Sequence, residues 1–348
     1  MDRRLFLQSF SALASCGVLP AQAATLSSPT VAPEAHANFT LPSNDAALRV
    51  GVVAVGGAGN ALLARYRDQL PGQPRAIALN TDAFGLVRSG ADVTIQVGEG
   101  FTQVRDPHTV RFLSQRVRPQ LAEALSELEL VFIIGAMGGA AGSGIAPMVA
   151  ETSREQGLLT VAGAMLPFAL EGPRRRQIAE AAFKALARRT DICVALDNQC
   201  FADCAGEETL SATLALAPAA FLPLYQSIWG ALGSEPRIAL DPADLRHLFS
   251  GGAGKVSMGF SSTGDQAFDE LLPRALAHPL FGETTLANAT ALLLCIQAPP
   301  SALKMTQVRK WVCALEAKAS KATVFWNVTV NPENGSKTAL TVLARADS

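Results

Sequence analysis

LVFIIGAMGGAAGSG, residues 130–144, is the most informative stretch of this sequence. Its first five residues form an uninterrupted apolar run, which is typical of a strand buried on both faces of a parallel sheet. The glycines that follow would let backbone N–H groups approach a ligand closely, and a helical pattern begins at Ala146. A strand, a glycine-rich loop and a helix in this order favour a phosphate site at the start of the helix.

A second loop of this kind lies nearer the N-terminus, in VAVGGAGN at residues 53–60. Alone it could be half of a dinucleotide fingerprint, since Asp82 lies near the spacing of a ribose-binding acid. A dinucleotide-dependent oxidoreductase is therefore one hypothesis. Two such loops in one sheet instead favour several phosphates held from both sides, which a simple dinucleotide site does not need.

Short apolar runs alternate with helical patterns from residue 48 onwards, which predicts a parallel sheet covered by helices on both faces. Strands are expected at 49–55, 75–79, 93–97, 130–134, 159–165 and 191–196, and helices at 60–69, 110–127, 146–155 and 174–188. Residues 209–232 read as a long helix despite Pro218 and Pro223. A smaller α/β domain follows, with strands at 289–297, 322–330 and 337–344 and helices at 268–277 and 305–317.

The composition excludes several classes of protein. The 348 residues are 49% hydrophobic and 17% charged, with a net charge of −1, so neither a disordered chain nor a nucleic-acid partner is expected. Six cysteines and four scattered histidines suit neither a disulfide scaffold nor a metal hydrolase, and we expect no metal held by protein side chains alone. Residues 130–150 carry no charge, but their five glycines and Pro147 favour a buried strand and loop over a membrane span.

The N-terminus resembles an export signal. Arg3 and Arg4 form a twin-arginine pair followed by Phe6-Leu7, and an apolar stretch leads to an A-x-A cleavage site at residues 21–23. Residues 1–24 are thus expected to be a twin-arginine-type signal peptide of a periplasmic protein, and residues 25–47 a linker. Two alternatives stay open: lipid anchoring at Cys16, and a cytoplasmic protein with an uncleaved N-terminus.

Taken together and in order, the motifs resemble the FtsZ/tubulin family, and bacterial FtsZ more than tubulin. The matching segments are VGGAGNA at 55–61, NTDA at 80–83, MGGAAGSGIAP at 137–147, PFALEGPRR at 167–175, DPAD at 241–244 and HPL at 278–280. The resemblance covers residues 48–346. It implies a tubulin/FtsZ-like GTPase domain with a Rossmann-like parallel sheet at 48–208, a long central helix at 209–233 and a smaller C-terminal α/β domain at 234–346.

The resemblance also implies roles for individual residues. GTP or GDP, with Mg²⁺ as a further candidate ligand, would be bound by Gly56, Gly57, Gly59, Asn60, Asn80, Asp82, Gly138, Gly139, Gly142, Ser143, Gly144, Glu171, Arg175 and Asn198. The glycines would hold the α- and β-phosphates, and Ser143 would offer a hydroxyl to a phosphate. Asn80 and Asp82 would lie near the γ-phosphate, Glu171 and Arg175 near the ribose and base, and Asn198 would read guanine.

The remaining implied roles concern assembly. Subunits would associate head to tail, in a polymer or a dimer. Asp241 and Asp244 would then complete the next subunit's site and polarise the attacking water, a role that suits carboxylates better than binding phosphate.

The sequence departs from the family pattern at several polar positions. Ala239 replaces an asparagine of the catalytic loop, Ala219 replaces a guanine-reading aspartate, and Ala140 and Ala141 replace a glycine and a threonine. The segment 101–107, where a third phosphate loop belongs, is short and lacks glycine. The principal hypothesis is a slow GTPase, and the alternative is a non-enzymatic scaffold that keeps the fold but binds nucleotide weakly or not at all.

Overall fold

The computed structural model describes residues 48–99, 104, 106–204, 209–233, 236–238, 240–249, 255–263, 268–282, 286–299, 303–330 and 337–346. All of them belong to one of two structural units, Asp45–Ser348. The predicted signal peptide (1–24), the linker (25–47) and Cys16 lie outside the described residues, as do Ala239 and most of the segment 101–107.

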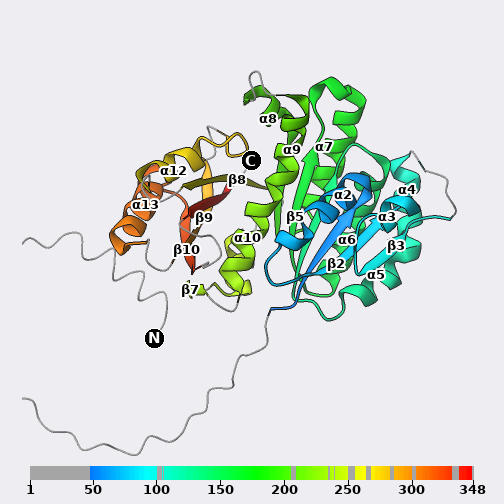
Figure 1. Ribbon diagram of the computed structural model, residues 1–348, viewed down its shortest axis with the longest axis horizontal. Coiled ribbons are helices and arrows are strands. Elements are labelled where there is room, and N and C mark those ends of the chain that lie inside the picture. Colours follow the sequence, from blue (N-terminus) through cyan, green and yellow to red (C-terminus); the bar gives the residue numbers. More distant parts are fainter. Residues whose placement is uncertain are drawn as a thin grey trace, which may run out of the picture. The chain divides into compact units, whose positions relative to one another are not determined.

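The first half is a parallel sheet in the order β3-β2-β1-β4-β5-β6, which confirms the predicted fold class (Figure 1). The strands are β1 (Val50–Val55), β2 (Arg75–Asn80), β3 (Val93–Gln96), β4 (Leu130–Ala136), β5 (Leu159–Leu166) and β6 (Ile192–Asp197). The helices between them are α2 (Gly56–Tyr66), α3 (Ala83–Val87), α4 (Pro107–Ser114), α5 (Arg118–Leu125), α6 (Ala140–Glu155) and α7 (Pro173–Ala187). Short 3-10 turns cover Arg67–Gln69, Gln115–Val117 and Ala169–Glu171.

Alternate residues of the buried strands face two separate apolar cores. Val52 and Ala54 of β1 join Leu63 of α2 on one face. Val53 and Val55 join residues of α4, α5, α6 and α7 on the other. Since both faces are covered, the central strands β1 and β4 are apolar throughout, as the sequence predicted.

The second half extends the sheet in the order β6-β8-β11-β9-β10-β7. Its elements are α8 (Asn198–Cys204), α9 (Leu210–Ala219), α10 (Phe221–Leu232), β7 (Pro236–Ile238), α11 (Pro242–Phe249), β8 (Lys255–Thr263), α12 (Phe268–Leu276), β9 (Ala289–Ala298), α13 (Met305–Lys318), β10 (Thr323–Val330) and β11 (Thr338–Ala346). β8 and β9 both pair antiparallel with β11, and β9 pairs parallel with β10. Among the described residues, β6 pairs with β8 at Cys193↔Lys255 and Val194↔Val256.

The predicted central helix at 209–233 is divided into two. α9 ends at Ala219 and α10 begins at Phe221, with Ala220 between them. Pro223 explains the division, because it has no N–H to donate and its ring crowds the carbonyl of the residue four positions earlier. The predicted helix at 110–127 is divided for the same reason, with a 3-10 turn at 115–117 just ahead of Pro119.

The α9–α10 segment runs from the carboxyl ends of the strands of the first sheet to their amino-terminal ends. α9 is in contact with α8, which follows the carboxyl end of β6. The Tyr225 hydroxyl, on α10, donates a hydrogen bond to the carbonyl of Pro71 at 2.9 Å, just before β2 begins. Tyr225 and Phe221 also pack against Phe132 of β4. The chain therefore leaves α10 at the amino-terminal edge of the strands.

Among the described residues, no helix is both long and apolar enough to span a membrane.

We predict that His278, just after α12, makes stability depend on pH. It lies between the rings of Phe260 and Phe201, with centroids 4.1 and 5.8 Å away. Burial lowers its pKa from 6.5 to about 4, so the folded protein holds it neutral where the unfolded chain takes up a proton. This contribution is complete above pH 6.5 and is lost as the pH falls toward 4.

Urea unfolding at pH 7 and pH 5 measures this effect. His278→Gln should remove about 1–2 kcal/mol of the loss between the two pH values, because a pKa lowered from 6.5 to about 4 accounts for about 2 kcal/mol at most and the ring is partly exposed. His108→Gln, on α4, is the control and should keep the slope of the parent protein. Equal slopes for the parent and His278→Gln would contradict the prediction.

Candidate functional site

The two glycine-rich loops lie side by side where the strand order reverses. β1 and β4 are neighbours in register, with Val55 opposite Gly135. α2 begins directly after β1, and α6 begins shortly after β4. In open α/β sheets this position, outside the carboxyl ends of the strands, is where ligands bind.

Both helices present an uncapped N-terminus there. Neither α2 nor α6 has a side-chain cap or an acidic residue in its first turn. The first N–H groups of a helix have no partner within the helix, and they carry the positive end of its dipole. Two such ends beside one another make an anion site.

Some of the predicted glycines are required because backbone segments approach one another closely at this site. A Cβ on Gly142 would lie 2.0 Å from the carbonyl oxygen of Ala136, and one on Gly59 would lie 2.6 Å from that of Ile134. Gly56 has φ +72°, and a Cβ on it would lie 3.1 Å from the nitrogen of Gly142. Glycine is thus required at Gly142 where α6 starts close to the end of β4, at Gly59 where α2 packs on β4, and at Gly56 where the two loops meet.

The remaining predicted glycines differ in what surrounds them. A Cβ on Gly144 would lie 2.8 Å from the carbonyl oxygen of Pro107, and Gly138, with φ +94°, packs against Arg175. A Cβ on Gly57 or on Gly139 would meet no other atom of the described chain within 4 Å. These two glycines, at the starts of the two helices, are where a ligand has room.

The methyl groups of Ala140 and Ala141 pack against the apolar core beneath α6. A Cβ on Gly56 would lie 3.3 Å from the Ala141 methyl, which therefore points to the first loop. The two alanines thus leave the space at Gly57 and Gly139 open.

Ser143 closes the second loop on itself. Its buried hydroxyl oxygen accepts a hydrogen bond from the Gly138 N–H at 2.9 Å. One of the loop's N–H groups is therefore used internally, while the hydroxyl proton remains for donation.

Asn60 and Asn80 form a buried pair that holds the first loop. With the Asn60 amide oriented so that both of its ends are paired, its nitrogen donates to the carbonyls of Ala54 and Gly56, both at 3.1 Å, and its oxygen accepts from the Asn80 amide at 3.2 Å. The Asn80 oxygen accepts from the N–H of Thr81 at 2.9 Å. Both side chains, predicted to bind nucleotide, are engaged within the protein.

Asp82, predicted to lie near the γ-phosphate, caps a helix. One of its carboxylate oxygens accepts a hydrogen bond from the Phe84 N–H at 3.1 Å, at the start of α3. The cap leaves the carboxylate half-buried at the carboxyl end of β2.

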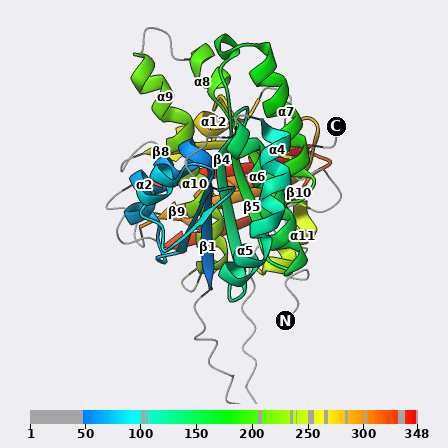
Figure 2. The same ribbon diagram turned by 90° about the vertical axis from the view of Figure 1, so that its right-hand side faces the viewer.

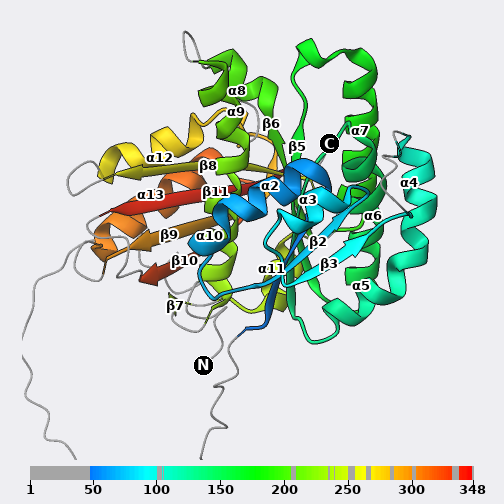
Figure 3. The ribbon, with the colours of Figure 1, turned by 45° about the vertical axis from the view of Figure 1, so that its right-hand side comes forward.

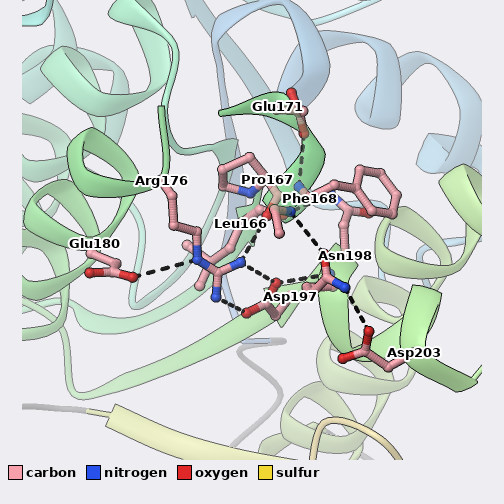
Figure 4. A network of polar contacts seen from close by, with 11 residues as sticks. Leu166, Pro167, Phe168, Glu171, Arg176, Glu180, Asp197, Asn198 and Asp203 are labelled. Carbon is pink, nitrogen blue, oxygen red and sulfur yellow. Dashed lines mark hydrogen bonds and ion pairs between the residues drawn. The ribbon is translucent and has the colours of Figure 1, made fainter. Parts of the chain in front are cut away.

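A second group of predicted residues lies where β5 and β6 end (Figure 4). Glu171 accepts a hydrogen bond from the N–H of Phe168 at 2.9 Å and forms an ion pair with Arg175 at 3.0 Å. Asn198 donates its amide N–H to the carbonyl of Leu166 at 2.8 Å. Its amide oxygen is buried and accepts no hydrogen bond from the described residues.

Asp241 and Asp244 lie near the amino-terminal ends of the strands, on the opposite side of the sheet from the glycine-rich loops. Asp241 accepts from the N–H of Ala243 at 2.8 Å, and Asp244 accepts from the N–H of Asp241 at 3.3 Å, at the start of α11. Leu240 donates to Ala231 at the end of α10 at 2.9 Å. Arg246 of α11 donates to the carbonyl of Gly157, ahead of β5.

The two carboxylates therefore lie away from the glycine-rich loops of their own chain. α11 is beside the amino-terminal ends of the strands (Figures 2 and 3). The loops follow the carboxyl ends, so the structure does not bring Asp241 and Asp244 together with the other predicted site residues.

Sequence reasoning missed one feature of the site. Arg176 forms a two-pronged ion pair with Asp197, with N–O distances of 3.0 and 2.5 Å. An acidic residue at the end of a buried strand, together with the arginine run at 174–176, was the available signal.

The cysteines near this group carry free thiols. Cys193 is buried, which raises its pKa to about 12, and Cys200 and Cys204 lie on α8. Within the described part of the chain, no group of three His, Cys, Asp or Glu side chains is arranged to hold a metal ion.

The residues present fit a nucleotide. Uncapped helix N-termini beside Gly57 and Gly139 suit phosphate oxygens. The unpaired oxygen of Asn198 suits an N–H donor on a base, since a buried acceptor without a partner is unfavourable.

Comparison with known proteins agrees with a nucleotide site at this position. Residues 49–206 match the Tubulin/FtsZ family, GTPase domain. The chain is 30% identical over 312 residues to the cell division protein FtsZ of Coxiella burnetii, covering 87% of this chain and 79% of that protein. It is 30% identical over 303 residues to the FtsZ of Pseudomonas putida, covering 85% and 75%. A solved FtsZ dimer of Methanocaldococcus jannaschii superposes with a TM-score of 0.77 at 26% identity, covering 85% of this chain and 88% of that one.

We predict that Gly142→Ala and Gly139→Ala differ sharply in their consequences for stability. The new methyl at 142 would lie 2.0 Å from the Ala136 carbonyl oxygen, so the start of α6 must move away from the end of β4. A loss of about 2–4 kcal/mol in the free energy of unfolding is expected, as for other overpacked backbone positions. At 139 there is open space, and urea unfolding should show a change below about 1 kcal/mol. Similar losses for both variants would contradict the proposed packing.

Proposed function

Because the chain belongs to the tubulin/FtsZ family, we propose that it binds GTP and GDP between the two glycine-rich loops and hydrolyses GTP slowly in a head-to-tail assembly. Each active site would be completed by Asp241 and Asp244 of the next subunit. The observation that carries this proposal is the pairing of two uncapped helix N-termini where the strand order reverses.

The chemistry of the loops supports nucleotide binding. A triphosphate needs several N–H donors, and the first turns of α2 and α6 supply them without an opposing acid. Guanine carries N–H donors on its edge, and Asn198 supplies an unpaired acceptor at the ends of β5 and β6. Mg²⁺, when bound, would neutralise phosphate charge, and Asp82 would be the acidic residue near its water ligands.

The position of α11 supports completion of the site by another subunit. Asp241 is exposed at the amino-terminal edge of the sheet, and the loops lie at the carboxyl edge. Head-to-tail stacking brings one edge of a subunit against the opposite edge of the next. A carboxylate there can orient and polarise a water for attack on the γ-phosphate. The similar protein of M. jannaschii has been solved as a dimer.

Slow hydrolysis follows from the groups that are absent. Ala219 offers no carboxylate to the guanine base, and Ala239 offers no amide in the catalytic loop. The scaffold alternative is favoured by the internal pairing of Asn60 with Asn80, since both amides are engaged without a ligand. The two functions differ in whether phosphate is released.

Phosphate release measured against protein concentration separates them. For a site completed in trans, the rate per subunit should rise steeply with concentration, and Asp241→Ala should lower it at least about 100-fold, as for loss of a general base. Asp269→Ala, an exposed acid on α12, is the control and should match the parent protein. A rate per subunit independent of concentration would exclude assembly, and no GTP binding at millimolar nucleotide would leave the scaffold.

Mixing two impaired variants tests the trans arrangement directly. Gly139→Arg fills the open space at the start of α6, whereas Asp241→Ala leaves that site intact. Each alone should be inactive, and a mixture should regain activity at those contacts that join an intact loop site to an intact Asp241. A mixture as inactive as its parts would contradict completion by a neighbouring subunit.

We also propose that the twin-arginine sequence at Arg3 and Arg4 directs export. That route carries folded proteins, so nucleotide would be loaded before export and retained as a structural ligand. Fractionation of cells producing a C-terminally tagged protein should place it in the periplasm, and Arg3→Lys with Arg4→Lys should retain it in the cytoplasm. A parent protein found in the cytoplasm would instead support an uncleaved N-terminus.

A further inference from the structure

The side-chain amide of Asn198 makes a hydrogen bond through its nitrogen but, within the described part of the chain, none through its oxygen. Its nitrogen donates to Leu166 at 2.8 Å, which fixes the plane of the amide and directs the oxygen away from β5. That oxygen is buried and has no partner among the described residues. Its direction therefore depends on what fixes the backbone on either side, at Asp197 and at the loop after Leu166.

Arg176 fixes both of these segments at once (Figure 4). Its two terminal nitrogens reach the two carboxylate oxygens of Asp197 at 3.0 and 2.5 Å. One of the same nitrogens donates to the carbonyl of Pro167 at 2.8 Å. Asp197 precedes Asn198, and Pro167 follows Leu166, which receives the Asn198 amide. One guanidinium thus links the residues next to both ends of that hydrogen bond.

This ion pair differs from an ordinary surface pair. The side chains of Arg176 and Asp197 are 29% and 12% exposed, and the contact is a fork on a carboxylate. Asp197 also accepts from the N–H of Gln199 at 3.0 Å, so it orders the start of α8 as well. The hydrogen bond to Asp197 raises the pKa of Arg176 above its ordinary value. By contrast, Glu180 meets the Nε atom of Arg176 at 3.5 Å and is 54% exposed.

We propose that Arg176 and Asp197 form a positioning pair that aims the Asn198 oxygen at the base, so that selection of guanine over adenine depends on a charge pair that itself does not touch the nucleotide. This inference rests on the proposed binding of guanine nucleotides. An acceptor oxygen pairs with the N1–H and amino group of guanine and faces a lone pair at N1 of adenine. A small rotation of the amide therefore weakens guanine binding and lessens the penalty against adenine.

The test is the ratio of GDP to ADP affinity, measured by calorimetry on the full-length protein. Asp197→Asn and Arg176→Gln should each lower this ratio about tenfold, as expected for loss of a charge-assisted contact. The double variant should lower it no further than either single change, because the two residues act as a unit. Glu180→Gln and Arg174→Gln, which remove a neighbouring charge but leave the fork intact, should keep the parent ratio.

A merely structural role would give a different pattern. It would lower the unfolding temperature and weaken both nucleotides alike, leaving the ratio unchanged, which would overturn the proposal. Arg176→Lys keeps the charge without the fork and should give an intermediate ratio even if Asp197→Asn does not fold. A parent protein that binds neither nucleotide would overturn the proposed function together with this inference. A parent that prefers GDP, with the same ratio in Arg176→Gln and Arg176→Lys, would overturn the inference alone.

Discussion

The contact between the two glycine-rich loops is the constraint on which the site depends. Gly56, with a left-handed backbone, lies so close to the second loop that a Cβ on it would come within 3.1 Å of the Gly142 nitrogen, and Gly142 has no room for a side chain because of Ala136 in its own loop. This closeness allows two helices from neighbouring strands to begin side by side. Their unpaired N–H groups then face one region, and the fixed positive ends attract anions without a charged side chain.

Much of the fold could be predicted from the sequence because the central strands of the first half, β1, β4 and β5, are buried on both faces. Continuous apolar runs such as 130–134 are informative for that reason. The helical patterns place the starts of α2 and α6 several residues too late, at 60 and 146, because glycines weaken a helical pattern even where they form the first turn. β8, with polar residues on its exposed face, and the short β7 and α11 carried no comparable signal.

The candidate site was predictable in its parts but not in its arrangement. Motif order identified the loops and the Asp241 segment, yet nothing in the order says that α10 carries the chain to the opposite edge of the sheet. The contact of Tyr225 with Pro71, between residues far apart in sequence, shows this. The Arg176–Asp197 pair was missed for a similar reason, since two charges in separate motifs have no local pattern that joins them.

The short pairing of β6 with β8 has a mechanical consequence. The two residue pairs that join β6 to β8 in the described part of the chain supply little backbone resistance to bending along that line, whereas β9 and β11 are joined along almost their whole length. Stiffness between the two halves comes instead from the side chains of α10, which contacts β9, β10 and β11 while its aromatic residues lie in the core of the first sheet. α10 therefore couples the two halves mechanically: a rotation of the second half is transmitted to the first through Phe221 and Tyr225.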